Sequence, residues 1–504
     1  MTPKKIFFLF LLFALSFWLR LSLLSKGAYH LDCLELGLRS EKALNTLQLQ
    51  FLTGAGYPVP IILGALTQGL ARCFSIRDPI LAINVLGALF GALCIPANYL
   101  AVRKLGDGTI AAFSSVLLSL SPLFLGVTVF GTTHPIALFF FLCGLYFLLR
   151  YLETGSLKDL LTAAVLLGLL GGSREQEMIL TAPAVALLHF LGTDKGGLPD
   201  ARQRIRAFLP AVLAASLTAG IFHLPYFLGS DRPAYFGQFS GVLQSGLLQN
   251  YPGLLSPLLR RSVMYLQDTF TFFGVMAAVS GMALLLKDRK LRTAAFLLSW
   301  FLFPFLFYGN MRTSLPRFFV ILLPAVYIAQ AIALARLTRA GRLMAFLGLV
   351  LLGTNTVLTF RYIHPLLRFR HQHELLIDYV RWISTVTEDN ARIIGIDINP
   401  FIRYYAGRQP LERPADLHKA DPEALSRFSK ELDQLLAQKV PVYITAPGML
   451  NYNQGHKFSD MINDRYRLEY IGGRTVEEWY TAPLYPEFNF YWLKRVLPRS
   501  GPGP

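Results

Sequence analysis

The sequence contains 504 residues, of which 53% are hydrophobic and only 16% are charged, and its formal net charge is +17 at pH 7. These proportions exclude a water-soluble globular domain of this length and indicate a polytopic membrane protein. Most of the basic excess lies before residue 361, where there are 29 Lys/Arg and 14 Asp/Glu, while residues 361–504 hold 19 and 17.

The first 360 residues are dominated by apolar segments. A membrane-spanning helix needs roughly 17 to 25 mostly apolar residues. Twelve candidate segments come near this length: an initial one up to Leu24, then residues 58–76, 80–101, 110–130, 134–149, 159–173, 177–191, 208–228, 268–286, 293–309, 317–335 and 343–360. The first follows a short basic start with no obvious cleavage site, so we expect a retained first helix.

Basic loops set the expected orientation. The loops at 195–206, 287–292 and 336–342 are rich in Lys and Arg, which collect on the cytoplasmic side of a cell's inner membrane. Counting from them places the N-terminus in the cytoplasm and the C-terminal tail outside. The alternation holds only if segment 58–76 does not cross, so we expect about eleven transmembrane helices and one short non-spanning helix. Charge beside a bilayer suits anionic lipid head groups, and we expect no nucleic-acid partner.

Two acidic residues follow the first predicted helix. Asp32 and Glu35 are three residues apart and Arg39 is four beyond Glu35, so on a helix all three share a face and form an ion-pair ladder. Alternatively, Asp32 points into an outward cavity as a general base that activates an acceptor hydroxyl or amine. Spacing alone does not choose between these interpretations.

The stretch GGSREQE separates two apolar segments on the outer side. A charged turn is enough to explain Glu175. Arg174 stands where a helix re-enters the membrane with unpaired backbone N–H groups, a combination that suits a phosphate anchored in the outer leaflet.

Further charged residues are predicted on the same side. Arg312 and Arg317 flank a short outer loop; such arginines commonly snorkel to the interface, but two in one outer loop oppose the usual charge distribution. His134 opens a helix beside Pro135, where a lone histidine is more often an ordinary surface residue. The long loop 229–262 is a candidate lid.

The tail has a different character. We expect residues 1–360 to form the transmembrane domain and residues 361–504 to form a small extracytoplasmic α/β domain. The stretches ARIIGID and PVYITA read as buried strands, with helices expected near 374–386 and 422–437. Acceptor binding and packing over the outer loops are both compatible with this domain.

Several common catalytic and metal-binding motifs are absent from the sequence. The sequence has no GxxxxGK[ST], GxGxxG, HExxH or serine-nucleophile motif, which disfavours nucleotide-driven pumps and hydrolases. Four cysteines without CxxC spacing indicate neither a metal site nor a disulfide framework; they are Cys33, Cys73, Cys94 and Cys143.

Several motifs, taken in order, resemble the GT-C membrane glycosyltransferases. They are the basic N-terminus, the first-loop aspartate, GAGYPVPIILGAL, THPIALFF, GGSREQE and LPRFFVILLPA. The resemblance covers roughly residues 5–360, and it is closest to the bacterial branch related to protein O-mannosyltransferases and the aminoarabinose transferase that acts on lipid A.

The resemblance implies sugar transfer from a polyprenyl-phosphate donor to a lipid, glycan or protein acceptor on the extracytoplasmic, periplasmic side of the cell envelope. Asp32 corresponds to the family's base or acceptor-orienting residue, with Glu35 as the nearby second acid. Arg317 corresponds to a donor-phosphate contact, and we add three further residues to the donor-phosphate site: Arg174, Arg312 and His134.

Two positions depart from the family pattern. Cys33 follows Asp32 where many relatives carry a second acid, and His134 stands where many carry an acidic residue. We therefore assign no metal ligand in the predicted site and no certain cofactor. Whether the protein uses a divalent metal is left open by the sequence.

Two other functions compete with glycosyl transfer. A transporter or flippase of a lipid-linked substrate also needs many helices and outer charges, but it is typically built from inverted repeats with charges at mid-membrane. The sequence shows no convincing repeat, and its charges cluster at the outer edge. A non-enzymatic assembly or receptor protein leaves the outer arginines unexplained.

Overall fold

The computed structural model of the protein describes residues 3–49, 57–194, 200–229, 257–311, 315–412, 422–451, 453–478 and 487–499. The chain divides into two compact units. The first contains the described residues up to 26 and those from 35 to 372, and the second contains residues 27–34 and the described residues from 373 onward.

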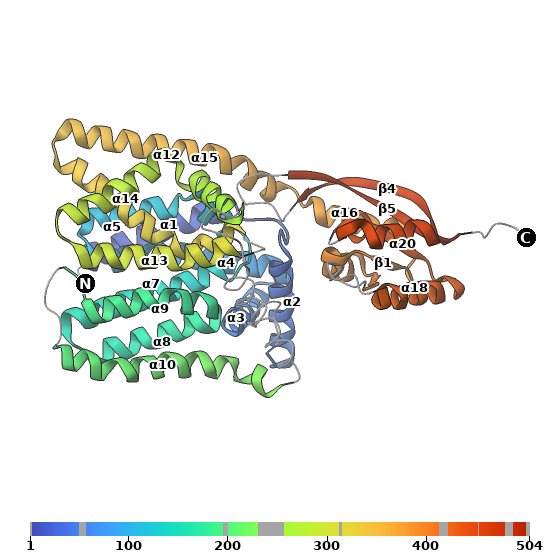
Figure 1. Ribbon diagram of the computed structural model, residues 1–504, viewed down its shortest axis with the longest axis horizontal. Coiled ribbons are helices and arrows are strands. Elements are labelled where there is room, and N and C mark those ends of the chain that lie inside the picture. The colour runs from blue at the N-terminus through green and yellow to red at the C-terminus, as the bar shows by residue number, and fades with distance from the viewer. Residues whose placement is uncertain are drawn as a thin grey trace, which may run out of the picture. The chain divides into compact units, whose positions relative to one another are not determined.

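The first unit is a bundle of helices that share one direction (Figure 1). Every one of the twelve apolar segments is helical, and segments 110–130 and 317–335 each form two helical elements. The bundle consists of α1 (Pro3–Ser22), α4 (Pro79–Leu105), α5 (Gly108–Ser119), α6 (Pro122–Thr128), α7 (His134–Thr154), α8 (Leu157–Ser173), α9 (Glu175–Leu191), α10 (Ala201–Leu228), α12 (Pro257–Lys287), α13 (Leu291–Asn310), the 3₁₀ helix η1 (Pro316–Leu322), α14 (Leu323–Arg339) and α15 (Arg342–Gln372).

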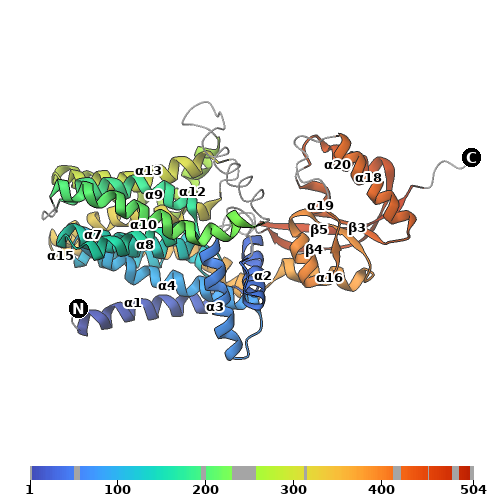
Figure 2. The same ribbon diagram turned by 90° about the horizontal axis from the view of Figure 1, so that it is seen from below.

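Two helices lie across the bundle direction at one end (Figure 2). They are α2 (Leu31–Thr46), of which residues 35–46 belong to the first unit, and α3 (Pro58–Cys73). Gln68 of α3 donates a hydrogen bond to the carbonyl of Gly37 in α2 at 2.8 Å. The 16-residue α3 fits the predicted short, non-spanning helix.

Fewer described helices meet the length and apolarity of a full membrane span than the eleven predicted. Seven do so, or eight if the bent pair α5 and α6 is one span. Length explains part of the difference, because α8 and α9 have 17 residues each, which is the lower limit for crossing the hydrocarbon core. Both nevertheless run in the common direction of the bundle (Figure 1).

Local sequence explains two breaks that matter for the site. Ser121 accepts a hydrogen bond from the backbone N–H of Phe124 and Pro122 occupies the first turn, so α6 starts afresh at an angle of 58° to α5. Between α8 and α9 a single residue, Arg174, adopts extended geometry at φ −162° and ψ 96°. The two helices therefore reverse direction around that arginine.

One arginine is fully buried inside the bundle. Arg20 of α1 donates to the hydroxyl of Thr128 at 2.9 Å and to the carbonyl of Ser16 at 3.1 Å, and its guanidinium lies 5.1 Å from the ring centre of Phe124. Among the described residues it has no carboxylate partner. The Thr128 hydroxyl and the Phe124 ring thus tie α1 to α6, while the Ser16 carbonyl is a partner within α1.

The second unit is a small α/β domain, as the tail sequence predicts. Its five-stranded sheet has the order β2-β1-β3-β5-β4, with β1 parallel to β2 and β3, and β5 antiparallel to β3 and β4. Helix α16 covers one face and helices α18 and α20 cover the other (Figure 2). The strands are β1 (Arg392–Ile394), β2 (Gln409–Pro410), β3 (Val442–Thr445), β4 (Tyr466–Glu478) and β5 (Glu487–Pro498); the helices are α16 (Leu375–Val386), α17 (Asn399–Phe401), α18 (Pro422–Ala437), α19 (Ala446–Leu450) and α20 (Lys457–Arg465), with the short helices η2 (Ile396–Ile398), η3 (Ile402–Ala406) and η5 (Gln454–His456).

The core of this domain joins the predicted elements. Phe428 and Leu432 of α18 pack with Phe458 of α20 against Val442 and Ile444 of β3. The predicted strands ARIIGID and PVYITA form β1 and β3, and the predicted helices form α16 and α18. Strands β4 and β5, which pair over twelve positions, were not among the predictions.

Candidate functional site

A buried ion pair occupies the junction of α8 and α9. The Nε of Arg174 lies 2.7 Å from Oε1 of Glu177, and one Nη of Arg174 donates to the hydroxyl of Thr133 at 3.0 Å. The side chains of Arg174 and Glu177 are 6% and 1% exposed. Burial lowers the pKa of Arg174, but the neighbouring Tyr57 and Glu177 together raise it by more than burial lowers it. The pKa therefore lies above its usual value and the guanidinium stays charged.

Glu177 also holds the histidine that opens α7. Nδ1 of His134 lies 3.3 Å from the same Oε1, and the His134 side chain is only 2% exposed. His134 and Arg174 are therefore joined through one carboxylate contributed by the first turn of α9. The prediction that His134 begins a helix beside Pro135 holds, but the residue is buried and is not an ordinary surface histidine.

An aromatic side chain connects this cluster to η1. The ring centre of Phe318 lies 5.9 Å from the His134 ring, 5.9 Å from the guanidinium of Arg174 and 5.4 Å from that of Arg317. Tyr308 of α13 stacks on the same ring at 5.4 Å. We call Arg174, Glu177, His134, Arg317 and Phe318 the arginine cluster.

The structure therefore brings together three of the four residues predicted to contact the donor phosphate. Arg174 and His134 share Glu177, and Arg317 lies next to them across the Phe318 ring. Arg312 lies outside the described residues, as does most of the candidate lid, residues 230–256. The two guanidinium groups of the cluster, those of Arg174 and Arg317, lie on the same Phe318 ring, and guanidinium groups are well suited to meet a phosphate.

The two predicted catalytic acids lie on α2. Asp32 is in its first turn with its side chain 42% exposed; its backbone N–H donates to Nδ1 of His30 at 3.0 Å. Glu35 pairs with Arg39 at 2.7 Å, so this part of the ion-pair ladder forms, while Asp32 turns toward His30.

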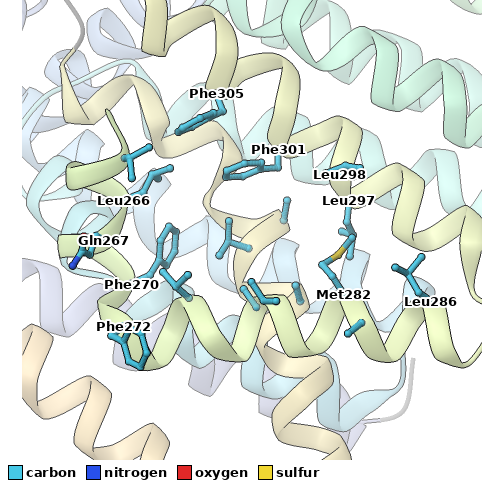
Figure 3. Close-up of a pocket in the computed structure, with 18 residues that line it drawn as sticks. Leu266, Gln267, Phe270, Phe272, Met282, Leu286, Leu297, Leu298, Phe301 and Phe305 are labelled. Carbon is cyan, nitrogen blue, oxygen red and sulfur yellow. The ribbon is translucent and has the colours of Figure 1, made fainter. Parts of the chain in front are cut away.

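A long apolar groove opens between α12, α13 and α14 (Figure 3). Its volume is about 830 Å³, and Gln267 is the one polar residue among the described residues that line it. Thr271 interrupts α12 within the groove at φ +58°, a strained value for a β-branched residue. The lining extends along α12 from Val263 to Leu286.

The groove and the arginine cluster meet at the same end of the bundle. Phe305 lines the groove and lies 6.1 Å, between ring centres, from Phe319 of η1, two residues after Arg317. Arg260 and Arg261 lie one helical turn before the first lining residue of α12, and both are exposed. The apolar groove thus ends beside several cationic side chains, those of Arg260, Arg261 and Arg317.

Sequence inspection missed some members of this site. Glu177 belongs to the stretch GGSREQE, which the sequence places on the outer side. Its shared contact with Arg174, three positions away, and with His134, 43 positions away, was not predicted. Nothing in the sequence around Phe318, apart from its aromatic side chain, indicated that it belongs to the site. The available clue was the pair of acids directly after Arg174, because acids near a membrane need a partner.

The described residues contain no group of three or more His, Cys, Asp or Glu side chains that could hold a metal ion. The arginine cluster combines two guanidinium groups, an imidazole and one carboxylate. Such a set favours an anionic ligand over a cation.

Comparison with known proteins identifies the fold. Residues 59–222 match the family model described as dolichyl-phosphate-mannose-protein mannosyltransferase. No protein of curated function matches the sequence.

Three solved structures have similar architecture. ArnT from Cupriavidus metallidurans bound to undecaprenyl phosphate is 13% identical with a TM-score of 0.61, and the match covers 98% of both chains. The Archaeoglobus fulgidus oligosaccharyltransferase AglB, in complex with an inhibitory peptide and a dolichol-phosphate, is 14% identical with a TM-score of 0.59 over 100% of this chain and 75% of the other. The same archaeal enzyme in complex with Zn and sulfate is 14% identical with a TM-score of 0.54 over 95% and 72%.

These matches define the class of the protein: it is a polytopic membrane protein with the fold of the GT-C glycosyltransferases. The resemblance predicted from its motifs is confirmed. The match to the mannosyltransferase family model further supports a glycosyltransferase as the particular kind of protein.

Proposed function

We propose that the protein transfers a sugar from a polyprenyl-phosphate donor to an acceptor on the extracytoplasmic face of the inner membrane. The observation that carries this proposal is the apolar groove of about 830 Å³ that ends beside the arginine cluster. A polyprenyl chain needs a long apolar site within the bilayer, and its phosphate needs cations at the membrane surface. One site of this chain offers both.

The matched structures agree with a lipid-linked donor. ArnT was solved with undecaprenyl phosphate and AglB with a dolichol-phosphate, and AglB was also solved tethered to an acceptor peptide. We extend the shared ligand chemistry to this chain. The proposed acceptor is a lipid, a glycan or a protein.

The proposed reaction divides its work between two groups of residues. Asp32 takes the proton of the acceptor hydroxyl or amine while that atom bonds to the anomeric carbon. The bond between the anomeric carbon and the phosphate oxygen breaks, and the bonding electrons leave with the phosphate. Arg317, with Arg312, stabilises the charge gained by this phosphate, while Arg174 and His134 fix the surrounding cluster.

The orientation follows from the basic loops. The end of α9, the start of α10 and the loops that join α12 to α13 and α14 to α15 lie at the bundle end opposite the junction of α8 and α9 (Figure 1). Because Lys and Arg collect in cytoplasmic loops, we propose that the cluster and the C-terminal domain are extracytoplasmic.

Replacing Arg317 with alanine should weaken donor binding by about tenfold to a hundredfold, the value of a hydrogen bond to a charged group. The dissociation constant of undecaprenyl phosphate measures this change. Arg72→Ala is the matched control, because this α3 arginine pairs with Glu41 and should leave the constant unchanged. Equal affinity in Arg317→Ala and the parent would remove Arg317 from the donor site.

A bulkier residue in the groove should weaken binding of the polyprenyl chain of the donor. Ala278 of α12 lines the groove, so Ala278→Phe is expected to raise the dissociation constant of long polyprenyl phosphates about tenfold through lost apolar contact. The effect should shrink for a short-chain analogue that does not reach the groove. The same loss for both chain lengths would contradict this placement of the chain.

The function itself is tested with the purified full chain and a panel of polyprenyl-phosphate sugars. Turnover of one donor with release of polyprenyl phosphate supports glycosyl transfer. Binding of a donor without turnover, together with its movement across reconstituted vesicles, would favour the transporter or flippase instead.

A further inference from the structure

A second groove lies on another side of α12, between this helix, α5 and α14. Its volume is about 580 Å³, and its walls include Leu117 of α5, Phe273 and Met276 of α12, and Leu334 of α14. Ala277 lines this groove and Ala278 lines the donor groove, while Ala283 lines both. The two grooves thus lie on adjoining sides of α12 and differ in most of their lining residues.

Two cations stand at one end of this groove. Lys287 is in the last turn of α12 and Arg336 is in the last turn of α14, and both line the groove with exposed side chains. They lie at the end of the bundle that carries the basic loops, opposite the arginine cluster (Figure 1). Apart from Ser280 and Gln330, the remaining described lining is apolar, so the groove is mostly apolar along its length and cationic at one end.

Three other cations at this end have acidic partners. Ion pairs join Arg339 to Asp107, Lys104 to Glu153, and Arg150 to Asp159. Among the described residues, Lys287 and Arg336 make no ion pair. Their positive charges are available to a ligand that enters from the membrane.

We infer that this groove binds an anionic phospholipid of the surrounding leaflet, with an acyl chain between α12 and α14 and its phosphate between Lys287 and Arg336. Charge complementarity selects this occupant, because basic pockets between membrane helices bind anionic head groups and apolar walls bind the chains. A zwitterionic lipid has the same chains without the net charge. The inference does not depend on the proposed transfer activity.

Native mass spectrometry of the full chain, purified in detergent and mixed with phosphatidylglycerol and phosphatidylcholine, tests the site. Phosphatidylglycerol should be retained about tenfold more than phosphatidylcholine, and Lys287→Gln combined with Arg336→Gln should abolish that preference. Lys290→Gln, a basic residue at the same end that does not line the groove, should keep it. Equal retention of both lipids by the parent, or an unchanged preference in the double variant, would overturn the inference.

A pair of adjacent variants tests the apolar walls. Ala277→Phe should reduce phosphatidylglycerol retention, whereas Ala278→Phe should leave it as in the parent. Because these residues are 100° apart around α12, each fills one groove only. If undecaprenyl phosphate displaces phosphatidylglycerol from the parent but not from Ala277→Phe, the groove belongs to the donor and the inference fails.

Discussion

Replacing Asp32 with asparagine is expected to reduce glycosyl transfer by about a hundredfold to ten-thousandfold, the usual contribution of a general base. The amide keeps the shape of the side chain but cannot take a proton from the acceptor. Asp32 lies in the first turn of α2 and its side chain is 42% exposed, so an incoming acceptor can reach it. Initial rates with a lipid-linked donor measure the loss, and donor affinity should stay unchanged.

Two variants of the same helix separate Asp32 from its neighbours. Glu41→Gln removes a carboxylate paired with Arg72 and should keep full activity. Glu35→Gln removes the acid paired with Arg39 and should lower the rate only a few-fold if Asp32 is the base. A fully active Asp32→Asn, or a larger loss in Glu35→Gln, would reject Asp32 for this role.

The second large effect concerns stability. Glu177→Gln should lower the free energy of unfolding by about 3–5 kcal/mol, because it leaves the buried charge of Arg174 without its carboxylate. The change also removes the anion that faces His134. Thermal unfolding of the detergent-solubilised protein, followed by tryptophan fluorescence, measures the shift in midpoint.

Matched variants show whether the lost charge is the cause. Arg174→Met combined with Glu177→Leu removes both charges and should recover much of the stability, since a buried pair is often replaceable by apolar residues. Glu153→Gln breaks the exposed pair with Lys104 and should cost only about 0–1 kcal/mol. A midpoint in Glu177→Gln equal to that of the parent would mean that Arg174 does not need this carboxylate.

The helices of the bundle could be predicted because a bilayer imposes a strong rule on sequence. A membrane span must be long and apolar, so each of the twelve segments could be recognised as helical from its sequence. The reversal after α8 was equally readable, because Gly171, Gly172 and Ser173 precede a charged residue. The strands β1 and β3 were visible as short apolar runs because they are buried in the middle of the sheet.

Contacts between distant parts of the chain could not be read in this way. Glu177 meets His134 from 43 residues away, and the two grooves are formed by helices whose apolar faces all look alike in sequence. Strands β4 and β5 carried a usable signal, the alternation of Phe488, Phe490 and Trp492. Their partners, however, follow only from the folded sheet.

The buried Arg20 has a consequence for how the protein is made. Its hydroxyl partner, Thr128, lies 108 residues further along the chain. At a synthesis rate of about 5–20 residues per second, α1 leaves the ribosome several seconds before α6 exists. During that interval Arg20 has only Ser16 of its own helix as a partner and lacks the Thr128 hydroxyl and the Phe124 ring. The packing that satisfies this buried arginine is therefore complete only after α6 has been synthesised.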